Sequence, residues 1–392
     1  MRYASICDRL SGLGGEKWAV HLEGRARAAR GDDLIFLSIG EPDLPPPAAV
    51  VDTAIDSLRS GRTKYTAGAG EPATLAAIAA HYSRRAGHRV DPAQIVYTAG
   101  TQHALSAVMW ALAEAGNEVL CPDPHYATYE AVVAATGASF VAVPTLPEHG
   151  FHLTPEALEA AITPRSRVLL LNTPSNPTGA VLSADKIDAI GVVCTRHDLW
   201  IVCDEVYADI TFGTDFASPF DRPQLRDRSV SVASISKSHA LPGFRSGWAA
   251  APVDLAKRLT TVVETMMFGS QPFLADAVVT ALSTRHPEVD QLAAAFRERA
   301  ESLVDALADC ESVGARMPEG GMFCLLDVRA TGLSGEEFAW RLLDEHVVVM
   351  PGESFGSKGA GHVRIALTVE SDVIVEACRR IAKLADGLVA AQ

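Results

Sequence analysis

The sequence predicts an α/β fold: a large domain with a mainly parallel sheet flanked by helices, joined to a smaller α+β domain. Its 392 residues exceed the size at which a single hydrophobic core stops growing, so two domains are expected. Between residues 95 and 236, short apolar runs alternate with helical patterns, which is typical of a parallel sheet covered on both faces. After residue 286, a long amphipathic helix is followed by a second set of strands and helices.

The large domain begins after a proline-rich stretch, residues 40–47, with a helical pattern over residues 48–58. We expect strands in the apolar runs at residues 95–97, 118–121, 139–143, 168–172, 200–203 and 229–236. We expect helices at residues 104–114, 129–136, 155–162 and 184–196. In open sheets of this type, ligands bind beyond the carboxyl ends of the strands, so the residues after each strand are the candidates for function.

The small domain is expected to combine the two ends of the chain. An amphipathic helix at residues 289–307 opens its C-terminal part. Strands follow at residues 322–328 and 362–366, and helices at residues 335–345 and 371–388. We therefore expect residues 48–286 to form the large domain, and residues 1–47 with 287–392 to form the small domain.

The composition favours a folded cytoplasmic protein. Hydrophobic residues make up 48% and charged residues 21% of the chain, which is typical of globular proteins. The net charge is −14 and the basic residues are scattered, so no nucleic-acid partner is expected. No apolar run approaches the length of a membrane span, and the first residues lack the pattern of a secretion signal. The seven cysteines include no C-x-x-C pair, which favours a reducing compartment and predicts no metal site.

The segment from residue 234 to residue 245 carries the strongest chemical signal. Lys237 follows a predicted buried strand and stands among hydroxyl groups and small residues. A lysine in that position suits a Schiff base with a carbonyl cofactor, because loss of water around the amine keeps it nucleophilic. Ser234, Ser236 and Arg245 would bind an anion beside it, such as a cofactor phosphate. For this segment alone, a surface lysine after a strand is the alternative.

Three other strand ends also carry polar residues. Two X-Pro steps and a glycine after residue 172 predict a rigid turn that aims the amide of Asn176, although a turn-capping asparagine is the alternative. Asp204 ends an apolar strand and could pair with a protonated ring nitrogen near Tyr207, unless it caps a helix. Gly100 and Thr101 open a predicted helix, whose free N–H groups would bind an anion, unless Thr101 is a simple N-cap.

Arg364 lies inside the predicted strand at residues 362–366. An inward-facing guanidinium there would match a carboxylate with two parallel hydrogen bonds. Because side chains alternate along a strand, an outward-facing arginine is the alternative.

Together these residues resemble class I pyridoxal-phosphate-dependent aminotransferases of fold type I. The matching motifs are Asn176-Pro-x-Gly, Asp204-x-x-Tyr207, Ser234-x-Ser-Lys237, Gly243-x-Arg245 and a late Arg364. Their order and spacing match over nearly the whole chain, from Gly40-Glu41-Pro42-Asp43 onward. Several motifs in order are far more specific than any one of them.

The resemblance implies a role for each residue. Lys237, as the catalytic residue, would form a Schiff base with pyridoxal 5′-phosphate and carry the proton of the reaction. Asp204 would pair with the nitrogen of the cofactor ring. Asn176 and Tyr207 would hydrogen-bond its 3′-oxygen, and Tyr126 would stack on the ring. The cofactor phosphate would be held by Gly100, Thr101, Ser234, Ser236 and Arg245.

The resemblance also implies substrate contacts and a dimer. Arg364, Asn176 and the backbone of Gly40 would bind the substrate α-carboxylate. Tyr65 would reach the phosphate of the neighbouring subunit, which implies a homodimer with shared active sites. Relatives often carry Asn-Pro near residues 268–272, so no role follows for Phe268 here.

The implied activity moves the amino group of an L-amino acid to a 2-oxo acid, such as pyruvate or 2-oxoglutarate, by a ping-pong mechanism. Within the family, residues 1–3, 236–240 and 320–323 are most similar to those of arginine:pyruvate transaminases, which makes arginine a candidate donor. Glu16 is then a candidate partner for a substrate guanidinium, with a solvated loop charge as the alternative. A β-lyase or an amino-acid oxidase or deaminase would share every cofactor residue. A non-catalytic regulator on this fold would be expected to add a basic DNA-binding module, which this sequence lacks.

Overall fold

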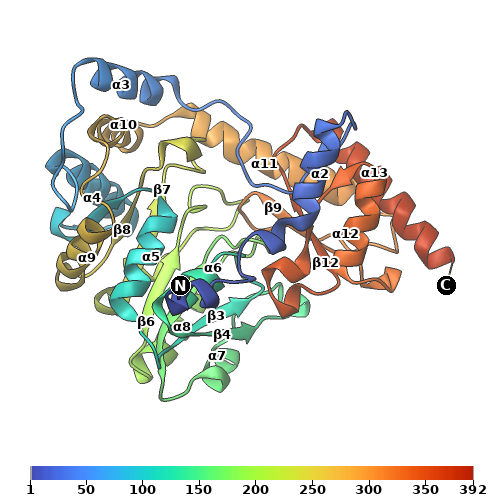
Figure 1. The fold of residues 1–392 in the computed structure, drawn as a ribbon, viewed down its shortest axis with the longest axis horizontal. Helices are drawn as coiled ribbons and strands as arrows, with labels where there is room; N and C mark the ends of the chain where they lie inside the picture. The colour runs from blue at the N-terminus through green and yellow to red at the C-terminus, as the bar shows by residue number, and fades with distance from the viewer. Residues whose placement is uncertain (1, 392) are drawn as a thin grey trace.

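A seven-stranded sheet forms the centre of the larger part of the molecule in the computed structural model, which describes residues 2–391 (Figure 1). All its strands run parallel except β8, which is antiparallel to both neighbours. In order across the sheet they are β2 (Ile95–Thr98), β8 (Gly247–Ala250), β7 (Ser229–Ser234), β6 (Trp200–Asp204), β5 (Ser166–Asn172), β3 (Glu118–Asp123) and β4 (Ser139–Pro144).

Helices cover both faces of this sheet. One face packs against α5 (Thr101–Leu112), α6 (Tyr129–Thr136) and α9 (Val253–Met266). The other packs against α4 (Pro72–Ala86), α7 (Pro155–Ala161), α8 (Ala184–Arg196) and α10 (Pro272–Ser283), with α3 (Ala48–Arg59) lying on α10. The predicted α/β fold is therefore confirmed.

Strand β5 shows why these apolar runs become strands. Leu169, Leu170 and Leu171 are all buried, although successive side chains of a strand point to opposite faces. Leu170 belongs to the core beneath α5 and α9, whereas Leu169 and Leu171 belong to the core beneath α7 and α8. A strand buried on both faces needs a continuous apolar run, which is the pattern that the sequence shows.

The rest of the molecule is built on a three-stranded antiparallel sheet, in the order β11 (Met350–Pro351), β12 (His362–Ala366) and β9 (Phe323–Asp327). It is packed by α11 (Pro287–Ala306), α12 (Gly335–Asp344) and α13 (Ser371–Ala390). At the N-terminus lie α1 (Ser5–Arg9), α2 (Ala19–Ala29) and β1 (Ile35–Phe36), and β1 pairs with β10 (Val347–Val348). The N-terminal segment thus meets the C-terminal part, while the domain boundaries near residues 47 and 286 stay a prediction.

Some elements differ from those that the sequence predicts. β7 ends at Ser234, two residues before the predicted end, because the chain turns there toward Lys237. The sequence does not predict α4, α9, α10 or β8. In α10 apolar residues occupy most positions and hide the helical period, and β8 consists mainly of small residues. β8 becomes a strand because it completes the pairing between β2 and β7.

The parallel strands bring their carboxyl ends to one edge of the sheet. Asn172, at the end of β5, is the register partner of Asp204, at the end of β6. Ser234 ends the next strand, β7, and Lys237 follows three residues later. The polar residues that the sequence places after three separate strands therefore lie side by side.

Two adjacent valines on α8 test the packing of this sheet. Val193 is 4% exposed in the core beneath α8, whereas Val192 is 59% exposed on the same helix. Val193→Ala should lower the free energy of unfolding by about 2 kcal/mol, from lost burial and the cavity that remains. Val192→Ala should leave it within about 0.5 kcal/mol, or raise it slightly, because alanine is the better helix former. Urea denaturation compares the two variants, and equal effects would contradict the burial of Val193 beneath α8.

Candidate active site

A pocket of about 350 Å³ lies at the carboxyl edge of the seven-stranded sheet, where β12 faces it. Most residues that the sequence analysis singled out line this pocket, although they come from nearly every part of the chain. They are Gly40, Thr101, Tyr126, Asn176, Asp204, Tyr207, Ser234, Ser236, Lys237, Arg245 and Arg364.

Lys237 projects its amine into the pocket. The Nζ atom donates a hydrogen bond of 2.6 Å to the carbonyl oxygen of Gly40. Burial lowers the pKa of Lys237 to about 8, against the opposing effect of the Glu41 carboxylate. The guanidinium groups of Arg364 and Arg245 lower the pKa further. The amine is therefore partly neutral near physiological pH, unlike that of a surface lysine.

Asp204 is buried at the floor of the pocket. Its Oδ2 atom accepts a hydrogen bond of 2.8 Å from the hydroxyl of Tyr129, and Oδ1 accepts one of 3.2 Å from the backbone N–H of Val206. Burial raises the pKa of Asp204 to about 6, although the Tyr129 hydroxyl opposes this shift. A turn follows β6 at this point, so Asp204 does not cap a helix.

Asn176 is aimed by the turn that follows β5. The backbone N–H of Asn176 donates a hydrogen bond of 2.7 Å to Oδ1 of Asn172, whose own amide donates to the carbonyl oxygen of Asp204 at 3.0 Å. The Asn176 side chain hydrogen-bonds Tyr207 and accepts a bond of 2.9 Å from Arg364. The turn predicted from the two X-Pro steps thus joins β5, β6 and β12 at the pocket.

Arg364 faces inward from β12 and is 1% exposed. Its guanidinium carbon lies 4.1 Å from the ring centre of Phe323 and 4.5 Å from that of Phe355. Nη2 donates to the carbonyl oxygen of Ser38 at 2.5 Å, while Nε is buried without a partner. Burial lowers the pKa of Arg364 to about 10. Within residues 2–391 no carboxylate pairs with this guanidinium, so it is suited to an incoming one.

The opposite wall of the pocket is suited to a phosphate. Helix α5 begins there, and its first residue, Thr101, has a buried hydroxyl oxygen without a partner. Gly100 has a φ of +83°, and a Cβ atom added to it would lie 2.6 Å from Nη2 of Arg245, so the guanidinium lies directly against it. The side chains of Ser234 and Ser236 line the same pocket. Helix N–H groups, hydroxyls and a guanidinium are the donors that bind phosphate.

The structure adds four residues that the sequence analysis did not single out. Tyr129 holds Asp204, and Asn172 holds the turn of Asn176. Trp18 and Glu41 line the pocket where the N-terminal segment crosses it. The spacing of Tyr126 and Tyr129 could have suggested the first, because residues three apart face the same way once they lie in a helical turn. The others depend on contacts between distant segments.

Gly100 borders this pocket through its contact with Arg245 but does not line it, and three further residues lie away from it. Tyr65 is 86% exposed and contacts the edge of Phe268, itself 69% exposed, with ring centres 5.6 Å apart. Glu16 lines a separate surface hollow with Lys17 and Glu353, so the structure does not bring it opposite Arg364.

Comparison with known proteins identifies the family. The profile described as aminotransferase class I and II matches residues 32–381 of this chain. The chain belongs to this family. It is a pyridoxal-phosphate-dependent transaminase, which transfers an amino group from an amino acid to a 2-oxo acid. The resemblance read from the motifs is thereby confirmed.

Known aminotransferases match this one over almost their full length. An arginine–pyruvate transaminase of Pseudomonas aeruginosa is 42% identical over 99% of both chains. An aspartate aminotransferase of Geobacillus stearothermophilus is 33% identical over 90% of this chain and 91% of its own. The structure of an aspartate aminotransferase from Thermus thermophilus with maleate has a TM-score of 0.92 and 30% identity, covering 98% of this chain and 100% of its own.

The pocket of this aminotransferase fits the cofactor of its family, pyridoxal 5′-phosphate. The cofactor needs a reactive amine, an anion site and a carboxylate for its ring nitrogen. Lys237 has the lowered pKa of such an amine, and Asp204 is a buried carboxylate. The unpartnered hydroxyl of Thr101 lies at the start of α5, where the phosphate is expected.

The lowered pKa of Lys237 has a consequence for stability that varies with pH. The pKa falls from an ordinary 10.5 to about 8 on folding, so below pH 8 the folded chain must hold a poorly solvated ammonium. In cofactor-free protein near pH 7, Lys237→Met should therefore raise the free energy of unfolding by about 3 kcal/mol, at about 1.4 kcal/mol per pKa unit. This gain should disappear as the pH rises from the folded to the unfolded pKa. Urea denaturation at a series of pH values measures it.

The control for this prediction is Lys257→Met, because Lys257 is exposed on α9. That variant should show no comparable dependence on pH. A gain for Lys237→Met that is the same at neutral and strongly alkaline pH would contradict desolvation as its cause.

Proposed function

We propose that this aminotransferase takes its amino group from arginine and passes it to pyruvate. The observation that carries the proposal is the 42% identity, over 99% of both chains, with an arginine–pyruvate transaminase. Two wall residues of the pocket support it. The Glu41 carboxylate can pair with a guanidinium, and the Trp18 indole can hold one against its face. Glu41 is exposed and has no hydrogen-bond or ion-pair partner in the described chain, so it is available for a ligand.

The cofactor would lie between the side of the pocket that carries Arg364 and the side at the start of α5. Thr101, Ser234, Ser236 and Arg245 would hold its phosphate at the start of α5, beside Gly100. Tyr126 also lines the pocket, where its aromatic ring could stack on the cofactor. When bound, pyridoxal phosphate supplies a carbonyl carbon for an amino group and a ring that withdraws electrons.

Lys237 would be the catalytic residue. Because its pKa is lowered to about 8, an appreciable fraction of the amine is neutral at physiological pH and can act as nucleophile and base. Nζ would take the proton from Cα of the amino acid and return a proton in the second half of the reaction. The carbonyl oxygen of Gly40 holds the amine at 2.6 Å, on the side from which the substrate would enter.

Asp204 would supply the negative charge for the ring nitrogen. Its pKa of about 6 leaves the carboxylate ionised at neutral pH, and the Tyr129 hydroxyl at 2.8 Å fixes its orientation. Asn176 and Tyr207 would hydrogen-bond the ring oxygen, since they lie next to one another at the pocket floor. Each of these side chains has a hydrogen-bond partner within the chain, which would orient it for the cofactor.

Arg364 would bind the α-carboxylate of both substrates. Its guanidinium is buried, packs against two aromatic rings and hydrogen-bonds only neutral oxygen atoms. A substrate carboxylate would satisfy the charge and orient Cα toward Lys237. The side chain of an amino acid held in this way would extend toward the remaining wall, where Trp18 and Glu41 lie.

A substrate panel tests the donor and the acceptor. Arginine, lysine, alanine and aspartate are each offered with pyruvate and with 2-oxoglutarate, and both products are measured. Arginine with pyruvate should give the highest kcat/KM. Aspartate should be lower by about tenfold or more, because an anionic side chain beside Glu41 loses at least about 1.4 kcal/mol.

Lys237→Ala is the control, since it should abolish turnover with every substrate pair. Release of ammonia without formation of a new amino acid would contradict transamination and indicate a lyase or deaminase. Failure of arginine with both acceptors, while another donor reacts, would refute the donor and leave transamination intact.

The proposal includes a homodimer with shared active sites. Tyr65 and Phe268 are large aromatic side chains that are mostly exposed, which is typical of an interface rather than a free surface. Their two loops are joined by a hydrogen bond of 2.8 Å from the Ser270 N–H to the Thr66 hydroxyl. This pairing presents both rings together, so Tyr65 would reach the phosphate site of a second copy.

Mixing two inactive or weakened variants tests the shared site. Tyr65→Phe should weaken cofactor binding about tenfold, as expected for one hydrogen bond to a charged group. Hybrids of Tyr65→Phe with Lys237→Ala should recover affinity at one site per dimer, because that site has both native residues. Cofactor titration of co-expressed hybrids measures this recovered affinity.

The control is a hybrid of Lys237→Ala with Tyr3→Ala, because Tyr3 is another exposed tyrosine. A monomer in light scattering would refute the proposal.

We place this enzyme in the cytoplasm. All seven cysteines are free thiols, which suits a reducing compartment. In residues 2–391 no helix has both the length and the apolar character needed to cross a membrane.

A further inference from the structure

Arg299, on helix α11, connects two segments that border the substrate side of the pocket. Its Nη1 and Nη2 atoms donate to the two carboxylate oxygens of Asp43, both at 2.8 Å. Nη1 also donates to the carbonyl oxygen of Leu367 at 3.0 Å. Arg299 does not line the pocket itself, so any effect on the reaction must pass through the segments it holds.

The first segment contains Gly40. Residues 37–40 are well anchored: the carbonyl oxygen of Leu37 accepts from the backbone N–H of Ala366 at 2.8 Å, and that of Ile39 accepts from the Thr368 hydroxyl at 3.2 Å. In residues 41–46, by contrast, the described hydrogen bonds are those that Asp43 accepts from Arg299. Three prolines in this stretch lack a backbone N–H, so a side chain must provide the anchor.

The second segment carries Arg364. Leu367, whose carbonyl oxygen Arg299 holds, lies three residues after Arg364 and just beyond the end of β12. Asp43 likewise lies three residues after Gly40. Arg299 therefore bonds to each segment three residues after the residue that faces the pocket, which is Gly40 in the first segment and Arg364 in the second.

The chemistry of Arg299 makes this contact costly to lose. The side chain is 2% exposed, and a buried guanidinium is stable only when its hydrogen bonds are satisfied. The paired bonds to Asp43 are the fork-to-fork geometry that fixes orientation as well as distance. Glu370 adds a weaker contact at 3.4 Å and is mostly exposed.

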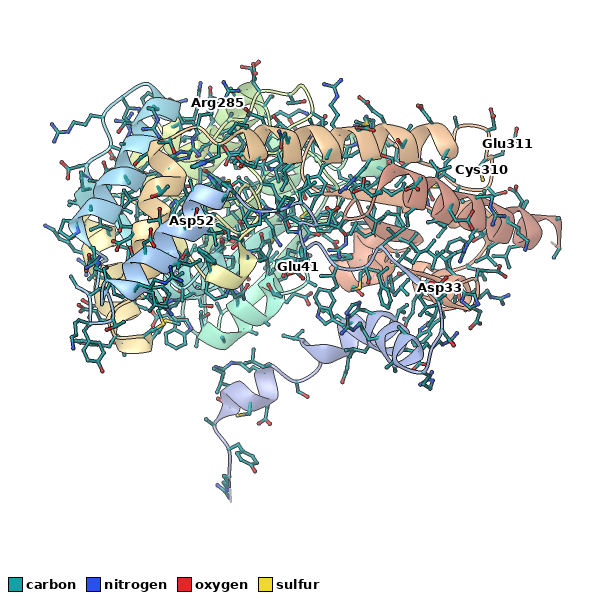
Figure 2. The ribbon with its side chains drawn as sticks, turned by 90° about the horizontal axis from the view of Figure 1, so that it is seen from above. Asp33, Glu41, Asp52, Arg285, Cys310 and Glu311 are labelled. Atoms are coloured by element: carbon teal, nitrogen blue, oxygen red, sulfur yellow. The ribbon has the colours of Figure 1, made fainter. Side chains whose placement is uncertain are left out.

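Helix α11 is well placed to hold the segments of Asp43 and Leu367 relative to each other. It begins directly after residue 286, where the boundary between domains is predicted, and packs against α13. Figure 2 shows it running along one side of the molecule from near Arg285 to near Cys310. A side chain on this helix can therefore set the position of the loop at residues 40–43 relative to β12.

We propose that Arg299 is a positioning residue, which sets the spacing between the Gly40 backbone and Arg364 by holding Asp43 and Leu367. The inference rests on the proposed role of Arg364 as the site of the substrate carboxylate. A change in this spacing would misplace the carboxylate relative to Lys237 while leaving the phosphate wall intact. Arg299 would thus act on substrate binding and not on cofactor binding.

The test uses the cofactor-loaded enzyme and 2-aminoisobutyrate, which has an α-carboxylate and an amine but no Cα hydrogen. Its dissociation constant is read from the cofactor absorbance, alongside KM and kcat for a reacting donor. Arg299→Met and Asp43→Asn should each raise this constant and KM by about tenfold, with a smaller change in kcat. Arg299→Lys should recover part of the loss. The double variant should be no worse than the poorer single variant, because both remove one contact.

Two controls separate positioning from general damage. Arg297→Met removes an exposed arginine from the same helix and should leave every constant unchanged. The dissociation constant of pyridoxal phosphate, measured in the same variants, should also stay unchanged. If Arg299→Met does not fold, Asp43→Asn carries the test, because Asp43 is partly exposed and its replacement leaves no cavity.

The positioning role of Arg299 would be overturned if folded Asp43→Asn or Arg299→Met bound 2-aminoisobutyrate as the native enzyme does. It would also be overturned if cofactor and 2-aminoisobutyrate affinities fell by the same factor. The variant Arg364→Lys separates failure of the proposed carboxylate site from failure of the positioning role of Arg299. If Arg364→Lys bound 2-aminoisobutyrate as the native enzyme does, the role of Arg364 as the carboxylate site would be refuted. If Arg364→Lys bound it weakly but Asp43→Asn bound it normally, only the positioning role of Arg299 would be refuted.

Discussion

The active site depends on the removal of three charged groups from water within one pocket. Asp204 and Arg364 are buried and Lys237 is partly buried, and loss of water shifts the pKa of each group in the direction that favours its neutral form. Such burial is unfavourable unless the groups are held by hydrogen bonds and meet a ligand of complementary charge. The rest of the fold can be understood as the scaffold that keeps these groups close together and out of contact with bulk water.

Each of the two sheets supplies part of the pocket. The seven-stranded sheet supplies Asp204 at the end of β6 and the segment of Lys237 after β7, which are neighbours because the parallel strands end at one edge. The three-stranded sheet supplies Arg364 from β12, on the far side of the pocket. The contacts of Asn176 with Arg364 and Tyr207 join the two contributions. The amine of Lys237 and the guanidinium of Arg364 thus reach the pocket from different sheets.

Much of this arrangement was predictable from local pattern. Continuous apolar runs such as residues 168–172 predict buried parallel strands, and polar residues after those runs predict a site at the edge of the sheet. Helices α6 and α8 match their predicted bounds because their apolar positions follow the helical period. Helix α10 was not predictable in this way, since it is apolar on most sides, and β8 is a strand only because β2 and β7 bind it on both sides.

The sequence by itself determined the fold class, the family and the chemical type of the pocket residues, because each of these follows from residue type and spacing along the chain. Only the tertiary structure decided that Tyr129 holds Asp204 and that Arg299 holds Asp43, a contact between residues 256 positions apart. It also placed Glu16 outside the pocket. The physical reason is that the strength of these contacts depends on burial and on distances between segments that no local pattern encodes.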